Sequence, residues 1–138
     1  MAAGLATEGT NAQRPRASDV ARTDVPTCGV DERLADVRER ARTTGWTASV
    51  VVNDERVVLG LLRSRELERD GELRVEQAMR PGPSTFRPFV SVQEMAARMA
   101  EHDLENSPIT TSDGRLLGLL LREDAARAAE LVSGEQPA

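Results

Sequence analysis

The chain has 138 residues, of which 39% are hydrophobic and 30% charged, and its formal net charge is −5. This length suits one compact unit or two very small ones, and the composition is ordinary for a soluble globular protein. The negative balance disfavours a general role in nucleic-acid binding, because contacts to phosphate need a surplus of positive charge. The single cysteine, Cys28, excludes an intrachain disulfide and a one-chain zinc cluster, and it fits a reducing cytoplasm. We expect Cys28 to be a small buried apolar group, with a bridge between two chains as the alternative.

Neither end of the chain has the apolar period of a helix or a strand. Residues 1–22 are predicted to be a disordered arm, and residues 133–138 a flexible tail. The first residues also lack the apolar stretch of a secretory signal peptide. The longest aliphatic run, at 116–121, is far shorter than the roughly 20 residues needed to cross a bilayer. We therefore expect a cytoplasmic protein that makes no contact with a membrane.

The first half of the ordered region predicts a helix, two strands and a second helix. Apolar residues at helical spacing predict a helix over 31–45, with Asp31 as its N-cap and Gly45 as its C-terminal stop. The segment 47–62 gives two strands of β-branched and aliphatic residues around an Asn-Asp-Glu turn, which is typical of a hairpin. A short helix is predicted over 64–71.

The second half predicts the same order of elements. Residues 75–84 contain two prolines and a glycine and are predicted to be a connection. Ser91 and Glu94 form a capping box, S-x-x-E, at the start of a helix. The segment 107–121 again gives a strand, an Asp-Gly turn and a strand, and 122–132 is an alanine-rich helix.

The two halves are copies of one unit. Residues 27–67 match residues 85–125 without a gap, at a constant offset of 58. The identical positions are few, and they are Thr27/Thr85, Arg40/Arg98, Ser49/Ser107 and the Gly-Leu-Leu at 60–62 and 118–120. The apolar positions correspond throughout, which makes internal repetition the strongest signal in the sequence. A unit of about 58 residues buries only about 60% of its unfolded surface, so we expect the two copies to bury their sheet faces against each other and fold together.

The order strand, helix, strand, strand, helix, repeated in tandem, resembles the CBS-domain pair, also called the Bateman module. The second copy is the closer match, through the stretches 78–86, Ser107-Pro108-Ile109, Asp113-Gly114 and 118–124. The first copy matches more loosely, through Val50-Val51-Val52, Gly60-Leu61-Leu62 and Glu66. The resemblance implies an α+β fold of two β-α-β-β-α motifs, at 23–74 and 75–132, related by a pseudo-twofold axis. It also implies a flat homodimer and a non-catalytic module that senses a ligand and signals to a protein partner.

The resemblance also implies where a ligand binds. In the family, two clefts between the motifs bind adenosine nucleotides or S-adenosylmethionine, and a G-h-h-[ST]-x-x-D motif (h, hydrophobic) serves each. The helix after the glycine strand offers backbone N–H groups to phosphate, and the aspartate accepts hydrogen bonds from ribose hydroxyls. Both copies depart from this pattern. The Ser/Thr position is Arg63 or Leu121, and the carboxylate is Glu66 or Asp124.

Each candidate residue also has a purely structural interpretation. Asp124 and Glu66 can simply stabilise the first turn of a helix through its dipole, worth roughly 0.3–1 kcal/mol. Arg63 can replace the missing hydroxyl with a bidentate phosphate contact or point into solvent. Thr27 and Thr85 can bind phosphate or satisfy turn backbone, and we favour the second. The resemblance adds candidate positions along the strands and in the motif, namely Pro108, Ile109, Val50 and Arg122.

These observations leave two functional hypotheses open. The first is a regulatory module that binds AMP, ADP, ATP or S-adenosylmethionine, with no cofactor required. The second is a degenerate CBS pair that serves only as a dimerisation or docking scaffold, because both motifs lack the Ser/Thr. An enzyme is not supported, since one histidine and one cysteine leave no catalytic constellation to assemble, and no metal site is expected.

Overall fold

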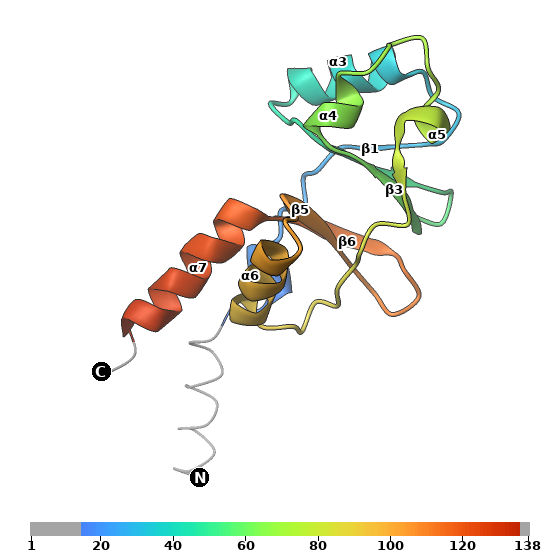
Figure 1. Ribbon diagram of the computed structural model, residues 1–138. Coiled ribbons are helices and arrows are strands. Elements are labelled where there is room, and N and C mark those ends of the chain that lie inside the picture. The colour runs from blue at the N-terminus through green and yellow to red at the C-terminus, as the bar shows by residue number, and fades with distance from the viewer. Residues whose placement is uncertain (1–14, 136–138) are drawn as a thin grey trace.

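The structure, a computed structural model, describes residues 15–135 and consists of two units that meet through their β-sheets (Figure 1). In Figure 1 the helices of each unit lie on the outer side of its sheet, so that the order of layers is helices, sheet, sheet, helices. This is the mixed α+β arrangement predicted from the repeat. No helix within residues 15–135 is both long and apolar enough to span a membrane.

The first unit follows the predicted order of elements. Its elements are β1 (Thr27–Cys28), α3 (Leu34–Thr43), β2 (Ser49–Val52), β3 (Val58–Leu62) and α4 (Ser64–Leu67). Strand β1 is parallel to β2, and β2 is antiparallel to β3 around the predicted turn. Gly45 ends the helix region with a positive φ of 78°, as predicted.

The second unit repeats this arrangement, except that its leading strand is reduced to one isolated parallel bridge between Phe86 and Ile109. Its elements are α6 (Val92–Glu101), β5 (Asn106–Thr110), β6 (Leu116–Leu121) and α7 (Arg122–Glu135). The Ser91 hydroxyl accepts a hydrogen bond from the backbone N–H of Glu94 at 3.2 Å, which confirms the N-cap. Helix α7 continues three residues beyond the predicted boundary at residue 132, and residues 136–138 of the predicted tail lie outside the described residues.

The predicted disordered arm is wrong for residues 15–22. Helix α2 (Ala17–Val20) lies within this segment, and the Ala17 side chain is fully buried in the core of the second unit. Arg22 then pairs with Leu119 of β6 through two backbone hydrogen bonds of 2.9 Å. A four-residue helix with one buried alanine has no apolar period, and its packing partners lie at the far end of the chain. The remaining residues of the arm, 1–14, lie outside the described part of the chain.

The predicted connection at 75–84 is likewise structured. It contains α5 (Val75–Ala78) and the short strand β4 (Arg80–Pro81), which pairs with β3. Val75 and Ala78 are buried in the core of the first unit. Helix α5 begins the second copy of the repeat by sequence, yet it completes the core of the first unit. Helix α2, which lies 58 residues earlier, does the same for the second unit, so the two copies exchange their leading helices.

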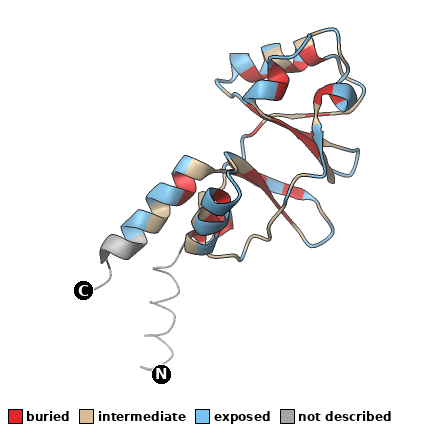
Figure 2. Ribbon diagram, viewed as in Figure 1, coloured by how far each residue is buried: buried red, intermediate tan, exposed pale blue. Residues whose placement is uncertain are grey.

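Three clusters of buried residues hold the molecule together, and Figure 2 shows the buried positions concentrated on the strands and on the helix faces turned toward them. The core of the first unit is formed by Cys28, Leu34, Val37, Ala41, Val51, Leu62, Leu67, Val75 and Ala78. The core of the second unit is formed by Ala17, Val92, Met95, Met99, Ile109, Leu120 and Ala125. The third cluster lies between the two sheets, in a contact that we call the seam, and is formed by Val25, Ala48, Val50, Leu61, Leu116 and Leu119.

Hydrogen bonds across the seam show the pseudo-twofold relation directly. The N–H of Val58 donates to the Gly114 carbonyl at 3.0 Å, and the N–H of Leu116 donates to the Arg56 carbonyl at 2.9 Å. Each pair becomes the other when 58 is added to one residue and subtracted from its partner. Arg56 and Gly114 also share a positive φ, of 66° and 89°. The predicted fold, two β-α-β-β-α motifs about a pseudo-twofold axis, is therefore confirmed.

The predicted N-cap of the first long helix is wrong. Helix α3 begins at Leu34 rather than after Asp31, and its first N–H groups find backbone acceptors instead of a side chain. The N–H of Leu34 donates to the Leu73 carbonyl at 2.8 Å, and that of Ala35 to the Gly71 carbonyl at 3.0 Å. Backbone carbonyls of the loop before α5 thus cap helix α3. A pattern of neighbouring residues cannot indicate a partner so distant in the sequence.

The glycines of the Gly-Leu-Leu strands lie where the exchanged segments cross. A Cβ atom at Gly118 would be 2.9 Å from the Arg22 carbonyl oxygen and 3.3 Å from the Ala21 Cβ. A Cβ atom at Gly60 would be 3.1 Å from the Arg80 carbonyl oxygen. Any side chain at either position would push away the incoming backbone of the leading segment.

We expect Gly118→Ala to lower the free energy of unfolding by about 1–3 kcal/mol, because the added methyl group overpacks a backbone crossing. Urea denaturation followed by circular dichroism measures this loss. Gly29→Ala is the matched control, since a Cβ atom there would meet no atom within 4 Å in the described structure. Equal losses in the two variants would contradict the close crossing.

Candidate functional site

A narrow cleft opens beside the seam, between the end of β3, the segment after β4 and the start of β5. We call this hollow, of about 70 Å³, the first cleft. It is lined by residues of both units, which are Leu61, Arg63, Arg80, Gly82, Pro83, Ser84, Leu104, Glu105 and Asn106. The Gly-Leu-Leu strands are adjacent, since Leu61 and Leu119 belong to the same cluster in the seam. The middle of the seam is filled by aliphatic side chains, which leaves its sides as places for a ligand.

Glu66, one of the two predicted ribose acceptors, is bound by Arg63 at the edge of the first cleft. Glu66 is only 8% exposed. The carboxylate accepts the Arg63 backbone N–H at 2.8 Å and the Arg63 Nε and Nη2 at 2.8 and 2.6 Å. Arg63 therefore does not point into solvent: it lines the first cleft, and its guanidinium forms a bidentate pair with Glu66 within the motif.

The charge state of Glu66 follows from this pairing. Burial favours the neutral acid, but the hydrogen bond and charge of Arg63 outweigh it and lower the pKa of Glu66 below its ordinary value. The Glu66–Arg63 pair thus keeps an ionised carboxylate at an edge position that is largely closed to solvent.

Asp124, the second predicted acceptor, is bound by an arginine that the sequence did not indicate. Asp124 is 9% exposed, and it accepts Arg22 Nε at 2.8 Å and Arg22 Nη2 at 3.3 Å. A more distant ion pair of 3.7 Å joins it to Arg127 of α7. Arg22 belongs to the exchanged leading segment, so the pair joins residues 102 positions apart in the chain. We call Asp124 with the charged residues around it the second site.

The two carboxylates therefore occupy corresponding places but are satisfied by different arginines. A buried carboxylate needs charged or hydrogen-bonding partners, and each of the two finds a bidentate guanidinium. A ribose hydroxyl could bind Asp124 only by competing with Arg22, and Glu66 only by competing with Arg63. Any ligand that uses these acceptors must displace or share an existing ion pair.

The predicted threonines have local structural roles. The Thr85 hydroxyl accepts a hydrogen bond from Arg87 Nη2 at 2.6 Å, and the Thr27 carbonyl accepts one from Arg40 Nη2 at 3.2 Å. Thr27 also pairs with Val50 in the parallel β1–β2 ladder. Neither contact joins a threonine hydroxyl to turn backbone, so the structural interpretation that we favoured stays a prediction.

Of the other predicted residues, three are unsuited to a side-chain contact in this structure. Val50 and Ile109 are fully buried, the first in the seam and the second in the core of the second unit. Arg122 points to Asp103, with Nη1 3.0 Å from Oδ1. The Pro108 carbonyl accepts the N–H of Phe86 at 3.1 Å, which joins β5 to the segment before α6.

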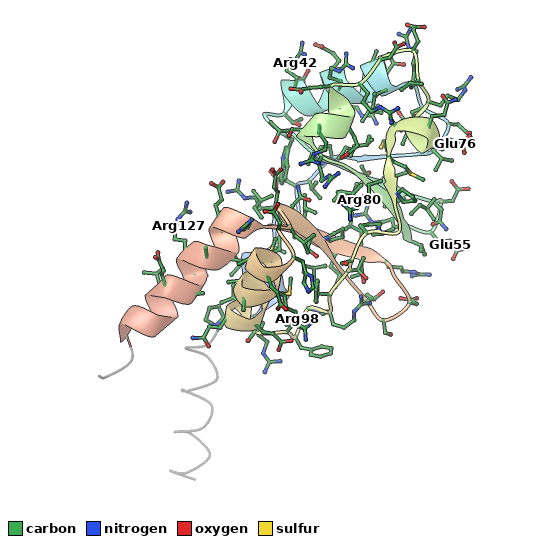
Figure 3. All side chains as sticks on the ribbon, viewed as in Figure 1. Arg42, Glu55, Glu76, Arg80, Arg98 and Arg127 are labelled. Carbon is green, nitrogen blue, oxygen red and sulfur yellow. The ribbon has the colours of Figure 1, made fainter. Side chains whose placement is uncertain are left out.

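Arg63 is the one lining residue of the first cleft that the sequence predicted as a site residue, and two of the others, Arg80 and Asn106, have groups suited to a ligand. Arg80 is exposed, and Figure 3 labels it near the edge of the first unit that faces the β5–β6 sheet. The side-chain oxygen of Asn106 is buried without a hydrogen-bond partner among the described residues. Extending the repeat back by ten residues would have aligned Arg80 with Arg22 and indicated both as a matching pair.

Two larger and more open hollows lie nearby. One of about 500 Å³ is lined by Thr47, Glu105, Asn106, Leu121, Arg122, Glu123 and Ala126. The other, of about 370 Å³, lies within the first unit and is lined by Arg38, Arg42, Gly45, Trp46, Thr47, Ser64, Leu67 and Glu68. The larger hollow shares Glu105 and Asn106 with the first cleft, so these two residues form the wall between them.

Cys28 has the environment expected of a small buried group. It is 4% exposed, and burial raises the pKa of its thiol to about 11, so that it stays protonated and unreactive. Within residues 15–135, no group of three or more histidine, cysteine or acidic side chains is arranged to hold a metal ion.

Comparison with known proteins places this geometry in a family. The family model described as the CBS domain matches the chain twice, at residues 17–69 and 75–131. The uncharacterized protein YtoI of Bacillus subtilis is 27% identical over 107 residues, which are 77% of this chain and 24% of that protein. The chain therefore spans about a quarter of the length of this curated relative.

Solved structures share the fold. The structure of CBSX2 in complex with AMP matches with a TM-score of 0.76 and 20% identity, covering 86% of this chain and 98% of that one. The CBS domain pair of MJ0100, in complex with methylthioadenosine and S-adenosyl-L-methionine, matches with a TM-score of 0.76 and 15% identity, covering 89% and 99%. At these identities the two matches establish the shared fold.

The lowered pKa of Glu66 predicts a change in the stability profile at acid pH. The ordinary value is 4.5, so the pair with Arg63 stabilises the folded state fully above that pH and loses this contribution as the pH falls through the lower folded value. In Glu66→Gln the free energy of unfolding should lie below that of the wild type near pH 6, and the gap should close as the pH falls below 4.5. Urea denaturation across this range measures the gap. Glu68→Gln, at an exposed neighbour, should run parallel to the wild type, and a gap for Glu66→Gln that is constant with pH would refute the assignment.

Proposed function

Because the chain belongs to the CBS-domain family, we propose that it is a non-catalytic regulatory module that binds an adenosine-containing ligand at the sides of its seam. AMP, ADP, ATP and S-adenosylmethionine are the candidate ligands. The module would function in the cytoplasm and would pass the change caused by the ligand to a protein partner.

One observation carries this proposal. Glu66 and Asp124 occupy corresponding positions in the two copies, each directly after a Gly-Leu-Leu strand and each buried against an arginine. A carboxylate opposes folding when it is buried without full pairing. Solubility requires only exposed charges, so two buried carboxylates at corresponding positions are unusual for a protein surface without a binding role. Carboxylates at the sides of the seam can accept the paired hydroxyls of a ribose once their arginines move.

The relatives support the choice of ligand class. CBSX2 is described in complex with AMP, and the CBS domain pair of MJ0100 in complex with S-adenosyl-L-methionine. All of these ligands contain adenosine, whose ring is apolar on its faces and polar at its edge. The first cleft offers the matching surfaces, with Leu61 and Leu104 as apolar walls and Asn106 as a polar group.

The volume of the first cleft gives the proposal a conformational consequence. Pockets for small molecules measure about 300–1,000 Å³, far above the 70 Å³ of this cleft. Ligand entry therefore requires the cleft to widen, and a ligand that prefers the wider state shifts the population toward it. Such a shift is the physical basis of a sensor, because a partner can bind the two states differently.

A ligand-free scaffold is the second candidate function, and two observations favour it. The middle of the seam is filled by Val50, Leu61, Leu116 and Leu119, and both motif carboxylates already have partners. In this alternative the ion pairs are permanent and the fold serves only for dimerisation or docking. The two candidate functions differ in one measurable property, the response of stability to ligand.

We expect the melting temperature to rise with the concentration of at least one of AMP, ADP, ATP and S-adenosylmethionine. A ligand present at 100 times its Kd stabilises the folded state by about 2.7 kcal/mol. The response should disappear in a Glu66→Gln/Asp124→Asn double variant and persist in Glu55→Gln, whose carboxylate lies in the exposed hairpin turn. A flat melting temperature up to millimolar concentrations of all four compounds would leave only the scaffold.

The family resemblance also supports a homodimer, and Leu131 of α7, which is 63% exposed, is an apolar side chain that such an interface could cover. We expect sedimentation velocity to give about twice the 15.0 kDa mass of the chain. A monomer at micromolar concentration would contradict this part of the proposal and leave ligand binding unaffected.

A further inference from the structure

The repeat allows the charges at the two sites to be compared position by position. Residues separated by 58 have corresponding surroundings, so a difference in charge between them is a difference between the sites themselves. Arg63 corresponds to Leu121, Arg65 to Glu123 and Gly82 to Asp24. Each of these three differences makes the second site more negative than the first cleft. Two others, Ser64/Arg122 and Glu105/Thr47, act in the opposite direction, and the five together still leave the second site more negative.

In the first cleft, arginines outnumber carboxylates. Arg63, Arg80 and Glu105 line it directly, and Glu66 lies at its edge in contact with Arg63. Arg65 is close enough to help lower the pKa of Glu66. The balance is three arginines against two glutamates.

In the second site, the balance is reversed. Arg22 and Arg127 both contact Asp124. Asp24 and Glu123 lie close enough to help raise the pKa of Arg22, after the larger effect of its hydrogen bond to Asp124. The second site thus contains two arginines and three carboxylates, and the Arg22 guanidinium already forms two hydrogen bonds with Asp124.

Arg80 of the first cleft occupies the position that corresponds to Arg22 of the second site. Its counterpart Arg22 binds Asp124 with two nitrogens, and by symmetry Arg80 would bind Glu66. Arg63, which has no charged counterpart, occupies that carboxylate instead. Arg80 forms no ion pair with any residue in the described range 15–135, and it is exposed at the cleft. An unpaired guanidinium presents donors in the fork geometry that fits phosphate oxygens.

We propose that the first cleft selects a phosphorylated adenosine ligand, with Arg80 as the phosphate-binding residue, and that the second site does not bind phosphorylated ligands. This inference rests on the proposed function and narrows it to adenosine nucleotides at one of the two sites. The excess of carboxylates at the second site repels phosphate. Asp124 binds the Arg22 guanidinium, so that this arginine is not free to bind phosphate. S-adenosylmethionine carries no phosphate, its sulfonium is repelled by Arg80, and only the carboxylate at the end of its amino-acid chain could pair with that arginine.

Asn106 provides a second feature that fits this ligand. Its side-chain oxygen is a buried acceptor with no donor in the described part of the chain, and such an atom destabilises the folded state until a donor arrives. The exocyclic amino group of adenine is a donor of suitable size. The counterpart of Asn106 is Ala48, which has no polar side chain, so this feature also favours the first cleft over the second site.

Isothermal titration calorimetry of the full chain with adenosine and ADP tests the proposal. We expect ADP to bind at one site per chain, at least about tenfold more tightly than adenosine, and with an affinity that falls as salt is added. Arg80→Gln should remove this preference by weakening ADP about tenfold while changing adenosine less than twofold. Arg98→Gln is the matched control, because it removes an exposed arginine of α6 that belongs to neither site and should retain the ADP preference.

The outcomes separate this inference from the proposed function. Equal affinities for adenosine and ADP, or an ADP preference that survives Arg80→Gln, would overturn the inference while adenosine binding still supported the sensor. Two ADP molecules per chain would overturn the exclusion of phosphate from the second site. If neither compound bound, the inference would fail, and the proposed function would rest on the melting-temperature response to S-adenosylmethionine.

Discussion

The structure depends on the exchange of leading helices between its two copies. Helix α2 completes the core of the second unit and α5 that of the first, so neither core is whole without the other copy. The exchanged backbone then crosses the Gly-Leu-Leu strands so closely that only glycine fits at positions 60 and 118. The exchange also positions the arginines, because Arg22 and Arg80 each follow a leading helix directly. The exchange of leading helices therefore determines both the packing of the fold and the positions of Arg22 and Arg80 at the candidate sites.

The symmetry of the backbone is not matched by symmetry of charge. One extra arginine in the first copy, Arg63, takes the carboxylate that Arg80 would otherwise bind. The second copy has Leu121 there, and Asp124 is bound by Arg22 across the chain. A gene duplication gives two equal sites at first, and a few later substitutions suffice to give them different chemistry.

The repeated hairpins and long helices were predictable because their side chains repeat at short range. The capping hydroxyl of Ser91 and the stop at Gly45 depend on local geometry alone, and both were found from sequence. The segment 15–22 was missed because a four-residue helix with one buried alanine gives no periodic signal. The structure buries both motif carboxylates against arginines, and neither pairing was predicted from the sequence. Asp124 is paired across 102 residues, a distance over which side-chain contacts leave no pattern in one sequence.

The exchanged helices make the tandem chain equivalent to an intertwined homodimer whose two subunits have been fused. A single copy would leave one core open and carry a helix with nowhere to pack, which is the situation that drives domain swapping between identical chains. Fusion turns that association into an intramolecular one and removes its dependence on protein concentration. A peptide bond cleaved at the exposed stretch around Gly82 would accordingly yield two fragments that stay wrapped around each other.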